Sequence, residues 1–290
     1  MALSHLFLTL LVVMIWGFNF VVIKLGLSHI PPLFFVCISF FLTSIPAIFF
    51  IKKPAAPWKM IAGYGILTFT LQFALLFLGM SAGVPPGLAS LLVQLQAFFT
   101  VLLAVIFLKE KLGVWQIAGI ALSFSGIALV ASHVGGSISW LGFFLVIGAA
   151  LAWACGNIMA KKMGNLNQLA LVIWGSFTAW PPLLILSLLT EDTVQLLSIW
   201  KNINWLSLGS IAYIAYLCSL FGFGIWNWLL SRYSLGKIAP FAILVPIFGI
   251  LSSVLVLKEP LQSWKILAAS LVVLGLLINV VSPYLSKKQS

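Results

Sequence analysis

The chain has 290 residues, of which 63% are hydrophobic and only 7% are charged. A soluble domain carries roughly 25% charged residues, so this composition excludes a water-soluble globular protein and predicts an all-α integral membrane protein. The net charge of +11 does not indicate nucleic-acid binding, because the fifteen Lys and Arg residues stand singly or in short groups at the ends of apolar stretches. Basic residues in such places orient a membrane protein in the bilayer.

A helix needs about 20 apolar residues to cross the hydrocarbon layer. By this length the sequence predicts ten transmembrane helices, joined mostly by short connections. They cover residues 6–27, 32–51, 58–80, 86–108, 112–132, 140–160, 169–189, 205–230, 237–257 and 263–281. The longest connection, residues 190–204, is predicted to be a polar loop.

Several motifs return at a fixed distance along the chain, which predicts a duplicated unit. Leu-Lys-Glu at 108–110 recurs 149 residues later at 257–259, and Trp16 matches Trp153 at an offset of 137. The predicted halves are residues 1–134 and 138–290. Since each half holds five helices, an odd number, the second half is expected to lie in the membrane in the inverted orientation.

The distribution of basic residues predicts the orientation of the chain. With a cytoplasmic N-terminus, eleven Lys and Arg residues fall on the cytoplasmic side and four on the outer side. Short cytoplasmic loops of membrane proteins carry an excess of positive charge. Both termini are therefore predicted to be cytoplasmic.

Four motifs together resemble the EamA family of the drug/metabolite transporter superfamily. They are Trp-Gly-Phe-Asn-Phe at 16–20, Leu-Lys-Glu-Lys-Leu at 108–112, Trp-Ala-Cys-Gly-Asn at 153–157 and Leu-Lys-Glu-Pro at 257–260. Within the family, the chain is most similar to bacterial exporters of cysteine and O-acetylserine. The resemblance implies an inner-membrane exporter with a central cavity between helices one to four and six to nine. Many members carry an Arg in the second helix where this chain has Ser39, which cannot clamp a carboxylate as Arg can.

The polar side chains inside the predicted spans are mainly amides, and an amide in hydrocarbon must find a partner on another helix or on a substrate. Trp153, Asn157 and Lys161 follow one another at intervals of four and share one helix face, which suits a small zwitterion. Gln94 and Gln96 point about 200° apart on a continuous helix, so at least one of them is expected to join helices instead. The candidate cavity residues are Trp16, Asn19, Gln72, Gln94, Gln96, Trp153, Asn157, Trp174, Tyr213 and Trp226.

Two further groups of residues are candidates for transport roles. Lys24 and Lys161 could contact a substrate carboxylate, although a lysine at a helix end also simply extends to the membrane interface. Prolines inside the spans remove backbone hydrogen bonds and allow kinks that a gating bundle could use. These prolines are Pro46, Pro181, Pro240 and Pro246.

The sequence thus predicts an efflux transporter that exports a small amino acid or related metabolite by alternating access. A broad-specificity drug or other-metabolite exporter is the alternative, and an accessory membrane subunit is a further one. An enzyme is not expected, because no span pairs a Ser or Cys nucleophile with a His or holds two Asp residues. The three cysteines show no metal-site spacing, and no cofactor is expected. The expected partners are the small-molecule substrate and the lipid bilayer, with the protein a monomer or a homodimer.

Overall fold

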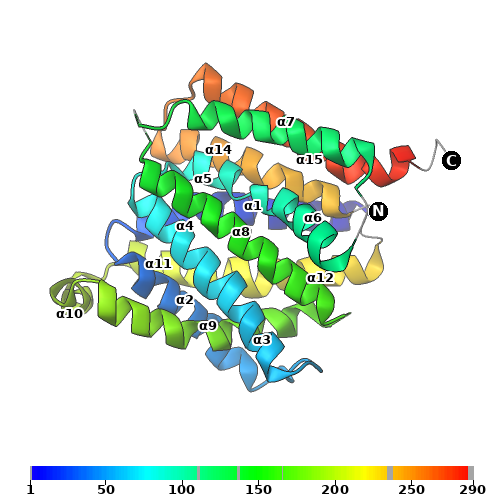
Figure 1. Ribbon diagram of the computed structural model, residues 1–290. Coiled ribbons are helices and arrows are strands. Elements are labelled where there is room, and N and C mark those ends of the chain that lie inside the picture. The colour runs from blue at the N-terminus through cyan, green and yellow to red at the C-terminus, as the bar shows by residue number, and fades with distance from the viewer. Residues whose placement is uncertain (1, 110–111, 136–137, 165, 234–237, 287–290) are drawn as a thin grey trace.

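The computed structural model describes residues 2–109, 112–135, 138–164, 166–233 and 238–286, whose regular elements are all helical (Figure 1). The first half contains α1 (Leu3–Gly26), α2 (Pro32–Ile48), α3 (Trp58–Gly65), the π-helical η1 (Ile66–Leu71), α4 (Gln72–Ser81), α5 (Pro86–Leu92), α6 (Leu95–Leu108) and α7 (Val114–Ala131). The second half contains α8 (Trp140–Lys162), α9 (Gln168–Thr190), α10 (Thr193–Asn202), α11 (Trp205–Ala212), the π-helical η2 (Tyr213–Gly222), α12 (Phe223–Arg232), the 3₁₀-helical η3 (Ala239–Ile243), α14 (Leu244–Leu257) and α15 (Ser263–Ser286).

The helices have the length and composition of membrane spans. In the part of the chain that the structure describes, eight helical segments are long and apolar enough to cross a bilayer, and two shorter apolar helices cover 32–48 and 241–257. The protein is therefore a multi-pass membrane protein. The ten predicted spans coincide with these eight segments and two shorter helices. Since α2 has only 17 residues, against the usual 20 or so, the number ten stays a prediction.

The repeated sequence has a repeated backbone. Lys109 and Lys258 are 149 residues apart, and each ends its helix in the left-handed region with φ of 55° and 53°. When the residue numbers of η1 are shifted by 149, they fall within those of η2. The helices α6 and α14 begin at the matching residues 95 and 244, each directly after a break in its span. The irregular features of the helices are thus duplicated together with the regular ones.

Contacts between the two halves occur in matching pairs. Helix α1 packs on α14, and its repeat mate α8 packs on α6. Likewise α1 packs against η2, as α8 packs against η1. The mates α2 and α9 pack on each other, and so do α7 and α15. In Figure 1, α7 and α15 run side by side along one edge of the bundle. An approximate two-fold relation between the halves accounts for all of these pairs.

The connection between α9 and α11 is not the polar loop that the sequence predicts. Residues 193–202 form the helix α10, which begins after Asp192 because the Asp192 Oδ1 accepts a hydrogen bond from the Val194 N–H (2.9 Å). An Asp at this position satisfies a backbone donor that the first turn leaves free. The prediction failed because the charged and amide residues of this stretch suggested a loop.

The carboxylate of Glu191 joins the end of α9 to the beginning of α2. Helix α2 begins after Pro31 without a side-chain cap of its own. The Leu33 N–H donates to one Glu191 carboxylate oxygen (2.6 Å) and the Phe34 N–H to the other (3.0 Å). The Ser187 hydroxyl also donates to Glu191 (2.6 Å). A carboxylate is favoured at a helix N-terminus, where it satisfies free N–H groups and the helix dipole is positive.

We expect Glu191→Ala to lower the free energy of unfolding by about 1.5–3 kcal/mol, because hydrogen bonds to a charged group are lost and two helix N–H groups lose their acceptor. Thermal unfolding of the purified protein in detergent would measure the change. Asp192→Asn is the control and should have little effect, because Asn and Asp cap helices about equally well. Equal midpoints for Glu191→Ala and the wild type would show that the carboxylate does not hold α2.

Helices α7 and α15 approach so closely that glycine is required at their crossing. A Cβ on Gly119 would lie 2.7 Å from the Gly275 carbonyl oxygen and 3.2 Å from the Asn279 nitrogen. A Cβ on Gly209, in α11, would meet no atom within 4 Å. Both glycines lie within helices, but only at Gly119 would an added methyl group meet another helix, so Gly209 serves as its control.

We expect Gly119→Ala to destabilise the protein by about 1–3 kcal/mol, because the backbones of α7 and α15 must move apart to admit the methyl group. Gly209→Ala should be neutral or stabilising by up to about 1 kcal/mol, since alanine is the better helix former. The same detergent unfolding assay measures both variants. A Gly119→Ala protein as stable as Gly209→Ala would mean that the two helices do not pack this tightly.

Candidate functional site

Two reciprocal hydrogen bonds join α1 to η2. The Trp16 indole N–H donates to the Cys218 carbonyl oxygen (3.1 Å), and the Tyr213 hydroxyl donates to the Ile15 carbonyl oxygen (2.9 Å). Each element thus supplies one side-chain donor and one backbone acceptor. Cys218 lies within the π-helical segment, where the regular hydrogen-bond ladder is interrupted and a carbonyl group becomes available to a side chain.

An aromatic cluster surrounds this junction, formed by Trp16, Phe223 and Trp226. The Trp16 ring centroid lies 5.2 Å from that of Phe223 and 5.2 Å from that of Trp226. The bare Gly222 backbone makes room for the indole, since a Cβ there would lie 2.6 Å from the Trp16 Nε1. The structure therefore brings together three of the predicted cavity residues, Trp16, Tyr213 and Trp226. Phe223 is not among the cavity residues that the sequence predicts.

Asn19 lies one turn after Trp16 on α1. Its side-chain carbonyl oxygen is buried and accepts no hydrogen bond from the residues that the structure describes. A buried polar group without a partner costs about 1–3 kcal/mol, and such groups are rare in folded proteins. The Asn19 oxygen is an acceptor for which the described part of the protein offers no donor.

Asn157 is already paired within the protein. Its amide Nδ2 donates to the Gln96 side-chain oxygen (2.9 Å) and to the Thr100 hydroxyl (3.1 Å), which joins α8 to α6. The Gln94 amide donates to the Ala242 carbonyl oxygen (3.4 Å) in η3. The prediction that at least one of the two glutamines joins helices is confirmed. The angle of about 200° between them does not apply, because the helix is interrupted between α5 and α6.

The other candidate cavity residues lie on other helices. Gln72 is buried at the start of α4, and Trp153 is half-buried in α8. Trp174 donates from its indole N–H to the Ile51 carbonyl oxygen (3.0 Å) and packs edge-on against Trp58 (5.6 Å between ring centroids). Its contacts are thus with the segment that follows α2.

The candidate lysines lie in the last turns of their helices, and the candidate prolines lie within helical segments. Lys24 is exposed in the last turn of α1, and Lys161 lies in the last turn of α8. Pro46 lies within α2 and Pro181 within α9, which pack on each other, and Pro246 is buried in α14. Pro240 begins the span of α14 within η3, but its side chain is outside the described residues.

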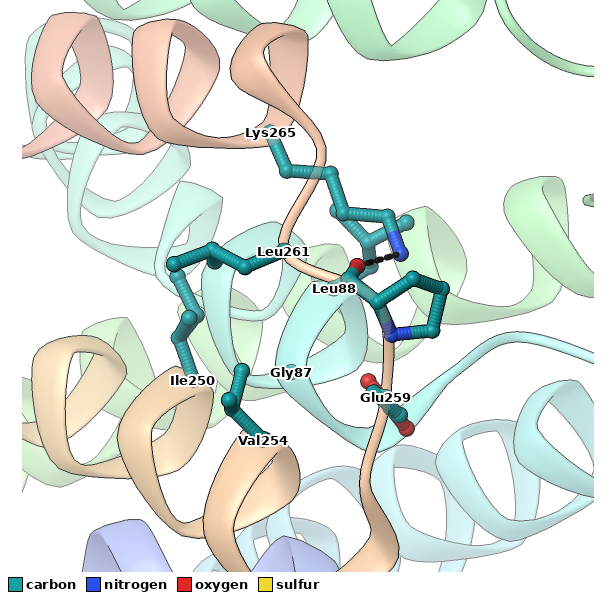
Figure 2. A pocket seen from close by; sticks show the side chains of 8 residues that line it. Gly87, Leu88, Ile250, Val254, Glu259, Leu261 and Lys265 are labelled. Atoms are coloured by element: carbon teal, nitrogen blue, oxygen red, sulfur yellow. Dashed lines mark hydrogen bonds between the residues drawn. The ribbon is translucent and has the colours of Figure 1, made fainter.

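Two pockets lie at repeat-related corners of the structure. One, of about 160 Å³, lies between α6, α7 and α8 and includes Lys161. The other, of about 10 Å³, lies where α5 meets the corner between α14 and α15 (Figure 2). The two share four pairs of repeat mates: Val101 and Ile250, Val105 and Val254, Leu112 and Leu261, and Gln116 and Lys265. Both are smaller than the roughly 300–1,000 Å³ of typical ligand sites.

The corner in Figure 2 brings Glu259 against the first half of the chain. Its carboxylate lies 3.4 Å from the position that a Cβ on Gly87 would occupy, next to the beginning of α5. Lys265 does not pair with it here but donates to the Pro260 carbonyl oxygen (3.1 Å). The repeated Lys-Glu motif thus serves as a contact between halves at this end, while its counterpart Glu110 lies outside the described residues.

Comparisons with known proteins agree with this arrangement. The chain is 40% identical over 279 residues to a probable amino-acid metabolite efflux pump of Escherichia coli, covering 94% of this chain and 93% of the relative. It is 41% identical to the protein of the same description from Salmonella typhimurium, covering 94% of each. A crystal structure of a protein with 15% identity covers both chains fully with a TM-score of 0.65, which shows a shared fold.

The sequence matches the EamA-like transporter family twice, over residues 3–132 and over residues 140–281. The two matches fall on the two halves that repeat each other in backbone and packing. The chain therefore belongs to the EamA-like transporter family, and it is a transporter rather than an enzyme.

Proposed function

We propose that the protein exports a small amino acid or related metabolite from the cell across the inner membrane. The observation that carries this proposal is the unpaired, buried side-chain oxygen of Asn19, one turn from the Trp16 cluster. An amide oxygen accepts hydrogen bonds from an ammonium group, and the faces of Trp16 and Trp226 attract a cation. The relatives described as probable amino-acid metabolite efflux pumps support the same substrate class.

The mechanism that we propose is alternating access by two inverted repeats, residues 1–134 and 138–290. The matching contacts α1–α14 and α8–α6 support it. With an approximate two-fold axis in the membrane plane, the two halves can exchange conformations, which converts an inward-open state into an outward-open one. The two repeat-related pockets also support it. Prolines in the packed pair α2 and α9 supply places at which these helices can bend.

The orientation that we propose places both termini in the cytoplasm. Figure 1 shows the beginning of α1 and the end of α15 at the same end of the bundle. The distribution of eleven basic residues against four favours the cytoplasm for that end. In this orientation the pocket at Lys161 opens toward the inner side, where a substrate carboxylate could reach the lysine. The protein would act as a monomer or a homodimer.

A broad-specificity drug or other-metabolite exporter is the second candidate. It is favoured by Ser39, which is fully buried and donates its hydroxyl hydrogen bond to the Phe35 carbonyl oxygen (2.8 Å) within α2. Ser39 therefore presents no cationic group to a carboxylate, and an aromatic site without such a clamp can also accept apolar compounds. A transport assay against both classes of compound distinguishes the two candidates.

We expect Asn19→Ala to change substrate affinity and Asn157→Ala to change protein stability. Asn19→Ala should weaken substrate affinity about tenfold or more, because a hydrogen bond to a charged ligand group contributes roughly 1.5–3 kcal/mol. Its stability should not fall, since the oxygen has no partner among the residues that the structure describes. Asn157→Ala should instead lower stability by about 1 kcal/mol, because it loses two bonds and such bonds between membrane helices contribute about 0.6 kcal/mol each on average.

Substrate binding and unfolding of both variants in detergent would measure these effects, with Gln96→Ala as the matched control. Gln96→Ala and Asn157→Ala remove the same interaction, so the double variant should be less destabilised than the sum of the two. Unchanged affinity in Asn19→Ala would remove Asn19 from the substrate site.

Transport should proceed without an imposed ion gradient, because none of the four Asp and Glu residues lies within a span and proton or sodium coupling generally uses such groups. Proteoliposomes loaded with labelled cysteine or O-acetylserine should release it down its own gradient. External unlabelled substrate should accelerate the release if the mechanism is exchange. Accumulation driven by a pH gradient alone, for a substrate of unchanged charge, would contradict this expectation.

A further inference from the structure

Helix α10 has two apolar faces, and the residues that the structure describes cover only one of them. Leu196 packs against the core and Ile199 is 3% exposed. Val194 and Leu197 lie on the opposite face and are 73% and 71% exposed. Residues three apart on a helix are neighbours, so these two side chains form one continuous apolar surface.

Short connections hold α10 at the level where two membrane helices end. Only two residues separate the end of α9 from the beginning of α10, and only two separate α10 from α11. A residue spans at most about 3.6 Å, so neither connection lets α10 leave that level. In Figure 1, α10 lies beyond the end of α9 and runs across it rather than along it. The helix therefore lies near the plane in which the bilayer surface meets the bundle.

The spans on either side of α10 also carry exposed apolar side chains next to it in the chain. Leu188 and Leu189, at the end of α9, are exposed, and Trp205, at the beginning of α11, is 88% exposed. Tryptophan at a span end is typical of the membrane interface. Such an apolar strip has no stable place in water, but it fits the boundary between headgroups and acyl chains, into which interfacial helices bury about 5–10 Å.

We propose that α10 is an interfacial helix that inserts Val194 and Leu197 into the bilayer at this boundary. The first half has no corresponding helix, because residues 49–57 connect α2 to α3 without one. Glu191, two residues before the first residue of α10, holds the beginning of α2 through two hydrogen bonds. The contact with lipid thus fixes the ends of α2, α9 and α11 to the membrane on one side of the protein only.

Fluorescence quenching tests the proposal. Val194→Cys, Leu197→Cys and the control Gln195→Cys are labelled with a fluorophore in the otherwise wild-type chain and reconstituted in phosphatidylcholine–phosphatidylglycerol nanodiscs. All three positions are exposed in the structure, and the label taken up by the unsubstituted chain, whose Cys37 and Cys218 are buried, is subtracted. The quenchers are a lipid with a nitroxide near its headgroup, and aqueous iodide.

We expect the lipid quencher to act several-fold more strongly at 194 and 197 than at 195, and iodide to show the reverse order. Equal access of iodide at all three positions would overturn the proposal, because α10 would then lie in water. Exclusion of both quenchers at 194 and 197 would also overturn it, since a second protein copy would then cover the face. Neither result depends on the substrate, so the proposed transport function is tested separately.

Discussion

The structure depends on one constraint: a backbone polar group inside a bilayer must find its hydrogen-bond partner within the protein. Regular helices meet it by themselves, but this chain interrupts its helices in each half, and there the partners come from side chains. Trp16 donates to the carbonyl of Cys218 in η2, and Gln94 donates to the carbonyl of Ala242 in η3. At a helix end, the Glu191 carboxylate accepts hydrogen bonds from two N–H groups of α2. Trp16, Gln94 and Glu191 are therefore placed where a helix is irregular or begins.

The duplication accounts for the arrangement of the helices, whereas several of the polar contacts lack a repeat-related counterpart among the described residues. Lys109 and Lys258 keep the same left-handed conformation, and the π-helical segments η1 and η2 overlap at the same offset. Yet Trp16 is hydrogen-bonded across the halves, while its mate Trp153 makes no such bond among the described residues. Helix α10 and Glu191 belong to one half alone. A transporter whose halves differ in this way need not have two states of equal energy, because each state breaks a different set of contacts.

Most of the fold could be predicted from the sequence. The length of the apolar stretches follows from the thickness of the bilayer, and the fixed repeat offset follows from the duplication of one unit of membrane-spanning helices. The sequence also pointed to Trp16, Tyr213 and Trp226, which the fold gathers in one place. It could not show that Asn157 is paired with Gln96 and Thr100 while the Asn19 oxygen has no partner in the described part of the chain, since the two amides look alike until their neighbours are known. The π-helical turns have no reliable sequence signal, and α10 was concealed by its polar residues.

The difference between the two asparagines bears on how such a transporter can be driven. A ligand shifts a conformational equilibrium only by as much as its affinity differs between the two states. Because the predicted spans contain no Asp or Glu, the proposed mechanism takes its differential binding energy from the substrate. Asn157 has its partners before the substrate arrives and can gain little. Asn19 holds a buried oxygen that has no donor among the described residues. If the substrate supplies that donor in one state only, as the proposed function requires, the gain of roughly 1.5–3 kcal/mol corresponds to a population shift of about ten- to a hundredfold toward that state.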